Sequence, residues 1–91
     1  MRLSAAAKAD VAAVWTYTNA RWGSDQADSY IATLRRAIAD SGASPLSGQR
    51  IDERWHCRRA GRHRIFYQIH EREVVIVRVL HMSMDERRHL P

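Results

Sequence analysis

The sequence predicts an α+β domain with the element order β-α-α-β-β-β, in which an N-terminal helical hairpin packs on a small antiparallel sheet. Two patterns support this class. Apolar residues recur at the helical spacing over residues 5–40, and they alternate at the strand spacing from residue 54 onward. The chain has 91 residues, a length typical of one domain with a modest core. We therefore treat residues 1–91 as a single domain.

Two helices are predicted in the first half. Ser4 is a suitable N-cap for a helix over residues 5–22, and Gly23 suits the left-handed position that ends such a helix. The apolar stripe of this helix contains Ala7, Val11, Val14, Trp15, Thr18 and Trp22. Ser24 or Asp25 then caps a second helix. Its stripe contains Ala27, Tyr30, Ile31, Leu34 and Ile38. So short a turn folds the helices back against each other.

The rest of the chain predicts short strands. Arg2–Ser4 is a strand before the first helix, and Ser41–Gln49 is a loop because glycine and proline interrupt the helical pattern. The later strands are Arg54–Arg59, Arg62–His70 and Glu73–His81, with turns at Ala60-Gly61 and Glu71-Arg72. The last strand is apolar on both faces, which is typical of a strand covered on both sides. The helical hairpin covers one face, and the other face needs a second cover.

One core is expected to collect the large apolar side chains of these elements. Their helical or strand phase places in it Trp15, Trp22, Tyr30, Leu34, Ile65, Tyr67, Ile69 and Val77. Tyr17 falls outside the helical stripe, so we expect it on the surface.

The C-terminal segment Met82–Pro91 predicts a short helical tail. Ser83 and Glu86 have the spacing of a capping box, which indicates two helical turns over Met84–Leu90. Two turns are not stable alone, so the tail has to lean on the sheet. Its basic residues form either a surface for an anionic target or a frayed terminus.

Composition excludes several classes of protein. Apolar residues make up 45% of the chain and charged residues 27%, which is globular rather than disordered. No apolar run approaches the length of a membrane span. Cys57 is the single cysteine, which excludes an internal disulfide and multi-cysteine metal sites. We expect a cytoplasmic protein without a metal or cofactor.

Positive charge is concentrated in the second half. The formal net charge is +5, and 14 of the 15 Lys and Arg residues are Arg. The segment from Arg54 to Arg64 holds five Arg and two His and no acidic residue. This cluster is consistent with a solvated strand edge that discourages aggregation. It is equally consistent with a docking surface for carboxylates or phosphates.

No strong catalytic motif is present. Walker, GxGxxG and HExxH patterns are missing, and His56 and Cys57 are adjacent, so a strand would point them to opposite faces. A metal-free ribonuclease would need a base, an acid and a cation at the phosphate. The residues available for those roles are Glu53, His56, Arg58, Arg59, Arg62 and His81.

Three groups of residues resemble one family. The first comprises Ala9–Val11, Val14–Thr18, Arg21–Gly23, Gln26-Ala27, Tyr30, Leu34 and Ile38. The second is Gly61–Tyr67, and the third comprises Val77–His81, Met84-Asp85 and Arg88–Leu90. In this order, and over nearly the whole chain, they resemble the ParE-type toxins of the RelE/ParE superfamily. The short, Arg-rich region Leu46–Arg59 departs from that family, in which the equivalent segment is often longer.

The resemblance implies the toxin half of a type II toxin–antitoxin pair. ParE-like toxins trap DNA gyrase with cleaved DNA, whereas RelE-like relatives cleave mRNA in the ribosome. RelE-type nucleases tend to have a catalytic Tyr or His near the C-terminus with Lys and Arg on the sheet. This chain has Lys8 alone and no tyrosine after Tyr67. A non-enzymatic gyrase inhibitor is therefore expected, with an mRNA endonuclease or an inactive basic binding module as alternatives.

The resemblance also implies an acidic, partly disordered ParD-like antitoxin and a hetero-oligomer with it. Its carboxylates are expected at Arg58, Arg59, Arg62 and Arg64, while an apolar segment covers the open sheet face at Phe66. Contacts with gyrase are expected from the tail, at Met84, Arg87, Arg88 and His89.

Overall fold

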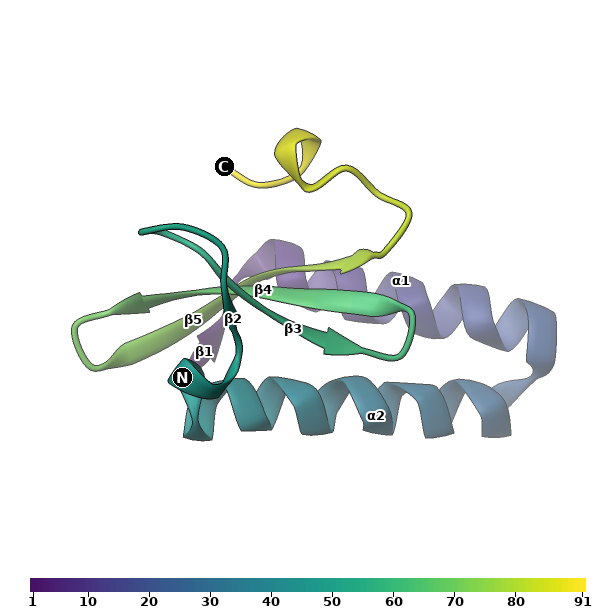
Figure 1. Cartoon of the computed structure of the whole chain (residues 1–91). Coiled ribbons are helices and arrows are strands. Elements are labelled where there is room, and N and C mark those ends of the chain that lie inside the picture. The colour runs from purple at the N-terminus through teal and green to yellow at the C-terminus, as the bar shows by residue number, and fades with distance from the viewer.

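The computed structural model describes residues 1–91 and confirms the predicted class and element order. Helices α1 (Ala5–Trp22) and α2 (Ser24–Ala43) form the hairpin. Figure 1 shows α2 on one face of the sheet and the C-terminal segment on the other. The strands are β1 (Arg2–Leu3), β2 (Gln49–Arg50), β3 (His56–Ala60), β4 (His63–His70) and β5 (Glu73–His81). Two single turns of 3-10 helix complete the chain, η1 (Pro45–Ser47) and η2 (Glu86–Arg88).

The sheet has five strands in the order β1-β5-β4-β3-β2. β1 runs parallel to β5, and every other pair is antiparallel. The strand β2 has two residues. Gln49 is the last residue of the region expected to be a loop, and Arg50 directly follows that region. The turn between β4 and β5 lies at Glu71-Arg72 as predicted, whereas the preceding turn is Gly61-Arg62, one residue later than predicted. Gly61 adopts φ +57°, a conformation that glycine accommodates without strain.

The ends of α1 were correctly predicted, but the start of α2 was not. The Ser4 hydroxyl accepts a hydrogen bond from the Ala7 amide at 3.0 Å, and Gly23 ends α1 with φ +90°. Gly23 is also the N-cap residue of α2, and no side chain caps that helix. The predicted cap at Ser24 or Asp25 is therefore wrong, because one glycine serves both helices.

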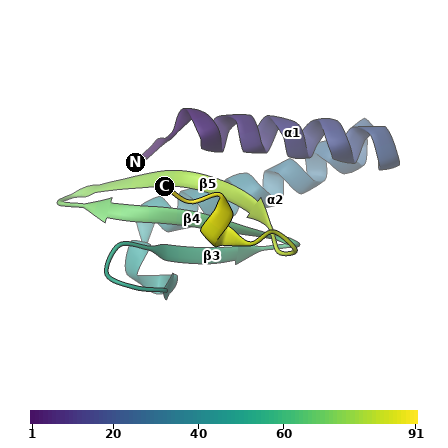
Figure 2. The ribbon, with the colours of Figure 1, turned by 90° about the horizontal axis from the view of Figure 1, so that it is seen from above.

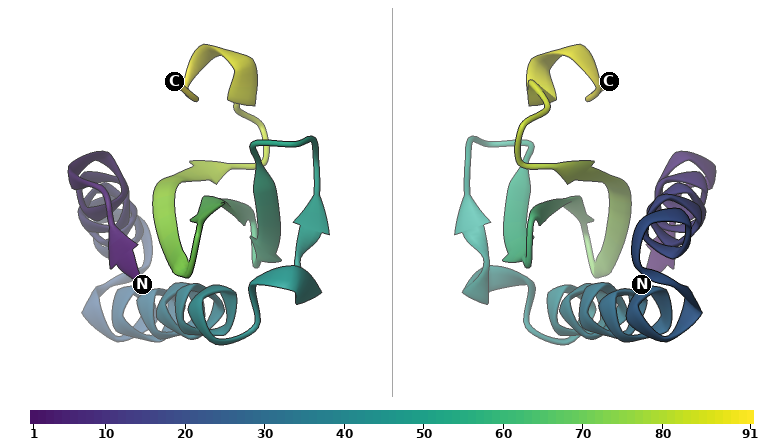
Figure 3. Two further views of the ribbon diagram at one scale, coloured as in Figure 1. Left: turned by 90° about the vertical axis from the view of Figure 1, so that its left-hand side faces the viewer. Right: turned by 90° about the vertical axis from the view of Figure 1, so that its right-hand side faces the viewer.

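The main core lies between the helical hairpin and the sheet. Figure 3 shows the two helices beside the strands in end view. Its buried members are Ala7, Ile31, Leu34, Ala37, Ile38, Ala60, Ile65, Tyr67, Val74, Ile76 and Val79. Trp15, Tyr30 and Ile69 pack against it only partly buried. Trp22 is 61% exposed, so its predicted place in the core is wrong. Trp22 is the last residue of α1, and this end of α1 extends past the ends of the strands (Figure 2).

A bulge divides β5 into two parts. Tyr67 pairs with Ile76 and Phe66 with Arg78, so Val77 is an extra residue without a direct partner on β4. Before the bulge Ile76 faces the helices, and after it Val79 does. Val77 packs on the opposite face instead of joining the predicted core.

The second face of the sheet carries a smaller core beneath the C-terminal segment. Trp55, Cys57, Phe66 and Leu80 are buried there, with Val77 and Leu90 packed against them. Burial raises the pKa of the Cys57 thiol. The tail thus covers the sheet face for which the sequence predicted no covering element.

The predicted capping box in the tail is wrong. Asp85, not Ser83, is the N-cap residue, and its carboxylate accepts from the Arg87 amide at 3.1 Å. Only the short η2 forms, in place of two turns over residues 84–90. Ser83 instead hydrogen-bonds with the His81 ring at 2.8 Å, which fixes it before the helix can begin.

Candidate functional site

The basic cluster predicted from the sequence is divided between the two faces of the sheet. Arg58 points toward the C-terminal end of α2, where its Nε donates to the Ser41 hydroxyl at 3.0 Å. Its Nη2 donates to the Ser47 hydroxyl at 2.6 Å and to the Ser44 carbonyl at 3.2 Å. These bonds hold the guanidinium in place without neutralising its charge.

Arg59 and Arg64 are cross-strand partners on the tail face. Arg64 Nη1 forms an ion pair with Glu86 Oε2 at 2.7 Å, and its guanidinium lies 5.1 Å from the centre of the Phe66 ring. Arg62 is exposed in the turn between β3 and β4. Arg64 is therefore the one member of the cluster that already has a carboxylate partner.

Phe66 does not lie on an open surface. Its side chain is fully buried beneath Trp55 and the tail, so the expectation of an uncovered apolar face is wrong. The reason is that Leu90 packs on this face and Glu86 holds the tail to Arg64. A partner can reach Phe66 only if the tail moves.

The tail residues expected to contact a target differ in exposure. Arg88 and Met84 are exposed, and Arg87 pairs with Asp85 at 3.3 Å. Hydrogen bonds from Arg87 lower the pKa of the Asp85 carboxyl. His89 is half-buried, and its carbonyl accepts from Arg78 Nη1 at 3.1 Å. Arg88 is thus the basic tail side chain with the freest charge.

The residues considered for a ribonuclease are not brought together. His56 pairs with Tyr67 and His81 with His63, so the two histidines stand four residues apart along β4. At strand spacing this separation is about 13 Å. Arg59 faces the tail side, Arg62 lies in a turn, and Glu53 is exposed in the loop before β3. The predicted constellation is therefore not assembled.

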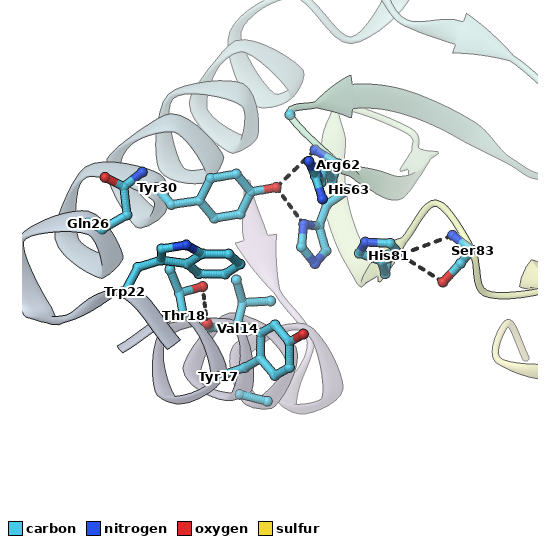
Figure 4. A pocket seen from close by; sticks show the side chains of 12 residues that line it. Val14, Tyr17, Thr18, Trp22, Gln26, Tyr30, Arg62, His63, His81 and Ser83 are labelled. Carbon is cyan, nitrogen blue, oxygen red and sulfur yellow. Dashed lines mark hydrogen bonds between the residues drawn. The ribbon is translucent and has the colours of Figure 1, made fainter. Parts of the chain in front are cut away.

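A cavity lies elsewhere, between the hairpin end of α1 and α2 and the ends of β4 and β5 (Figure 4). Its volume is about 790 Å³. It is lined by Ala13, Val14, Tyr17, Thr18, Trp22, Gln26, Tyr30, Gly61, Arg62, His63, His81 and Ser83. Arg62 and His81 were considered as functional residues from the sequence, whereas Trp22 and Tyr30 were assigned to the core and His63 to no site.

Three rings are linked at the inner end of this cavity. The Tyr30 hydroxyl lies 2.6 Å from His63 Nδ1, and it accepts a hydrogen bond from the Arg62 amide at 3.0 Å. The rings of His63 and His81 meet edge to face at 5.2 Å. Burial, and then the neighbouring His81, lower the pKa of His63, while Asp10 acts in the opposite direction.

No three His, Cys, Asp or Glu side chains gather as they would around a metal ion. Neither α1 nor α2 combines the length and apolarity needed to cross a membrane.

Comparison with known proteins decides the family. The model of the family described as "ParE toxin of type II toxin-antitoxin system, parDE" matches residues 1–86. The chain belongs to the ParE toxin family. It is thus the toxin component of a type II toxin–antitoxin system, as the resemblance implied.

Individual relatives agree with this family. Toxin ParE1 of Caulobacter vibrioides is 44% identical, and the match covers 98% of this chain and 95% of the relative. Toxin ParE1 of Mycobacterium tuberculosis is 40% identical, with 97% and 94% covered. A solved structure titled "Chromosomal ParDE TA system from P. aeruginosa" matches with a TM-score of 0.78 over 88% of this chain and 91% of that one. At 12% identity this last likeness shows that the ParE fold is shared.

Within this ParE toxin, the guanidinium groups on β3 and β4 and the aromatic cavity are separate features. The guanidinium groups lie along β3 and β4, partly under the tail. The cavity lies at the end of the hairpin where α1 and α2 are joined. Arg62 belongs to both, because the turn that carries it borders the cavity.

Proposed function

We propose that this ParE toxin binds DNA gyrase without catalysing a reaction itself, and that an acidic ParD-like antitoxin neutralises it in the cytoplasm. The observation that carries the proposal is the unneutralised charge along β3 and β4. Arg58, Arg59 and Arg62 have no carboxylate partner within the chain. A partner rich in Asp and Glu supplies those partners, and guanidinium–carboxylate pairs are among the stronger polar contacts.

The pair formed by Arg64 and Glu86 indicates how the antitoxin engages the sheet. Both side chains are partly exposed, at 25% and 30%, so solvent and a competing carboxylate have access to them. An antitoxin carboxylate that replaces Glu86 at Arg64 would loosen the tail and uncover Phe66. The expected apolar contact at Phe66 therefore depends on this exchange.

Contact with gyrase is assigned to the tail. Met84, Arg87, Arg88 and His89 lie on a segment that η2 shapes and that three kinds of contact attach to the sheet. Positive side chains on such a segment suit an anionic target such as gyrase with its bound DNA. The antitoxin contacts and the gyrase contacts thus adjoin at Arg64.

The proposal is tested by producing the toxin without an antitoxin and measuring two quantities in the same cells. Gyrase-linked DNA breaks are expected to accumulate while cellular mRNA stays intact. Fragmented mRNA without DNA breaks would instead support the endonuclease alternative. Growth arrest with neither signal would reject both targets.

A further inference from the structure

Flat rings are the largest group of side chains that line the cavity at the end of the hairpin. Five of its twelve residues carry them: Tyr17, Trp22, Tyr30, His63 and His81. Only Ala13 and Val14 contribute aliphatic side chains. Tyr17 and Trp22 are 60% and 61% exposed, and the Arg21 guanidinium lies 5.4 Å and 5.3 Å from their ring centres. This wall suits a planar ligand better than a branched aliphatic side chain.

Hydrogen bonds orient both imidazoles of the cavity. The Ser83 amide donates to His81 Nδ1 at 3.1 Å, so neutral His81 carries its proton on Nε2. The Tyr30 hydroxyl already accepts from the Arg62 amide, and its own proton has two acceptors in reach, His63 Nδ1 at 2.6 Å and the Ala60 carbonyl at 3.5 Å. We assign the proton to the much shorter contact, with His63. His63 then also carries its proton on Nε2. Each ring keeps one N–H donor that no other group in the chain uses.

Positive charge adjoins these donors, and no acidic residue lines the cavity. Arg62 contributes an exposed guanidinium at the rim. Arg59 lies near the end of β3 on the tail face, and its Nε is 3.5 Å from the Gly61 carbonyl of the same turn. A phosphate at the imidazole end would meet hydrogen-bond donors and a cation, and a second phosphate on the far side of the turn would meet Arg59.

We propose that this cavity binds a nucleotide of single-stranded nucleic acid, with the base against Trp22 and Tyr17 and a phosphate at His63, His81 and Arg62. A stacked base uses the flat wall, and the phosphate uses the imidazole donors and the guanidinium. The position of Arg59 beyond the turn favours a strand over a free nucleotide. The site is independent of the proposed action on gyrase.

Binding is tested with a fluorescently labelled thymidine hexamer, by anisotropy at low salt. Trp22→Ala is expected to weaken binding by about tenfold or more, because base–aromatic stacking is lost. Arg62→Ala is expected to weaken binding of the hexamer. It should also make the affinity less dependent on salt, by about the amount that one phosphate contact contributes. Leu46→Ala removes a more exposed apolar side chain outside the cavity, and Arg36→Ala removes an exposed charge on α2. Both controls are expected to bind normally.

Two further probes separate the parts of the proposal. A hexamer without bases keeps the phosphates, and thymidine monophosphate keeps one nucleotide. Weak binding of both, relative to the intact hexamer, supports the site. Equal binding of the abasic hexamer would show attraction by charge alone, and equal binding of the monophosphate would show a free-nucleotide site. Unchanged affinity of a folded Trp22→Ala variant, or no binding of the hexamer, would also overturn the proposal.

Discussion

Asp10 on α1 and Arg78 on β5 form a two-point ion pair, with Nε–Oδ2 and Nη2–Oδ1 distances of 2.8 and 2.9 Å. The Arg78 side chain is 21% exposed and that of Asp10 is 15% exposed. The same carboxylate accepts the Val79 amide at 2.9 Å, beyond the point where β1 stops pairing with β5. Because Arg78 also donates to the His89 carbonyl, one ion pair joins α1, β5 and the tail.

Removing this carboxylate should destabilise the whole fold. We expect Asp10→Ala to lower the free energy of unfolding by about 3 kcal/mol, because Arg78 and the Val79 amide lose their partner while largely buried. Urea denaturation measures the loss. Asp40→Ala, which removes an exposed carboxylate from α2, is the control. A loss below about 1 kcal/mol would show that water replaces the carboxylate.

One residue from the apolar stripe of each helix gives an opposite prediction for stability. Leu34 is fully buried, so Leu34→Ala should cost about 2–5 kcal/mol. Trp22→Ala should cost less than about 1 kcal/mol, because most of that side chain already contacts water. Chemical denaturation of both variants checks this order. A large loss of unfolding free energy for Trp22→Ala would show that Trp22 belongs to the core, as its helical phase predicts.

The sequence predicted the helices and long strands well because their periodic patterns extend over many residues. It failed at Trp22, since a helical stripe does not reveal where the sheet beneath it ends. It also failed in the tail, where the contact between Ser83 and the ring of His81 competes with helix capping. Such local competition follows from where the last strand ends, which the pattern alone does not specify.

Prediction of the site was less complete for a similar reason. The division of the basic cluster follows from strand alternation, since Arg58 and Arg59 are adjacent and must face opposite sides. The cavity could not be predicted this way. It joins the ends of α1 and α2 to Gly61–His63 and His81, segments that only the tertiary fold brings together.

Stability should depend on pH through His63. Its pKa in the folded protein lies below the ordinary value, so the unfolded chain binds more protons as the pH falls through about 6.5. The free energy of unfolding should therefore decrease from pH 8 to pH 5. The groups acting on His63 are Tyr30 on α2, His81 on β5 and Asp10 on α1.

His63→Asn tests this assignment, because its side-chain oxygen can still accept from Tyr30 while the titrating ring is absent. Unfolding measured at several pH values should give a smaller decrease for the variant than for the parent chain. The same slope in both proteins would assign the dependence to other groups.

Antitoxin binding should depend on the exposed arginines at the end of β3 and in the turn that follows it. We expect Arg59→Glu with Arg62→Glu to weaken binding by more than about tenfold, because attraction becomes repulsion. Calorimetry at two salt concentrations measures it, and affinity should fall as salt rises. Arg35→Glu with Arg36→Glu makes the same change of charge on the exposed face of α2. If both double variants bound the antitoxin with equal affinity, the arginines at this turn would be solvent-exposed charges without a specific role in binding.

The tail should be needed for toxicity and not for folding. Deleting residues 83–91 removes Leu90 and the Glu86 pair but leaves the main core intact. We expect cooperative unfolding at lower stability, retained antitoxin binding, and growth of cells producing the truncated toxin. Exposure of Phe66 should appear as increased binding of an apolar dye.

A full-length variant separates lost charge from lost structure. Arg87→Gln with Arg88→Gln keeps Leu90 and Glu86, so it should stay as stable as the parent chain and still be less toxic. Undiminished killing by the folded truncation would contradict a role for the tail. Failure of the truncation to fold would place the tail in the core.

The bulge at Val77 determines how β5 tolerates one-residue insertions and deletions. Because Val77 has no direct partner on β4, its deletion would leave every later side chain on its present face, and His81 would still meet His63. Deleting Val79 instead would exchange the faces of Leu80 and His81, which turns Leu80 toward the helices and places a histidine beneath the tail. Deleting Val77 should therefore disturb the fold less than deleting Val79.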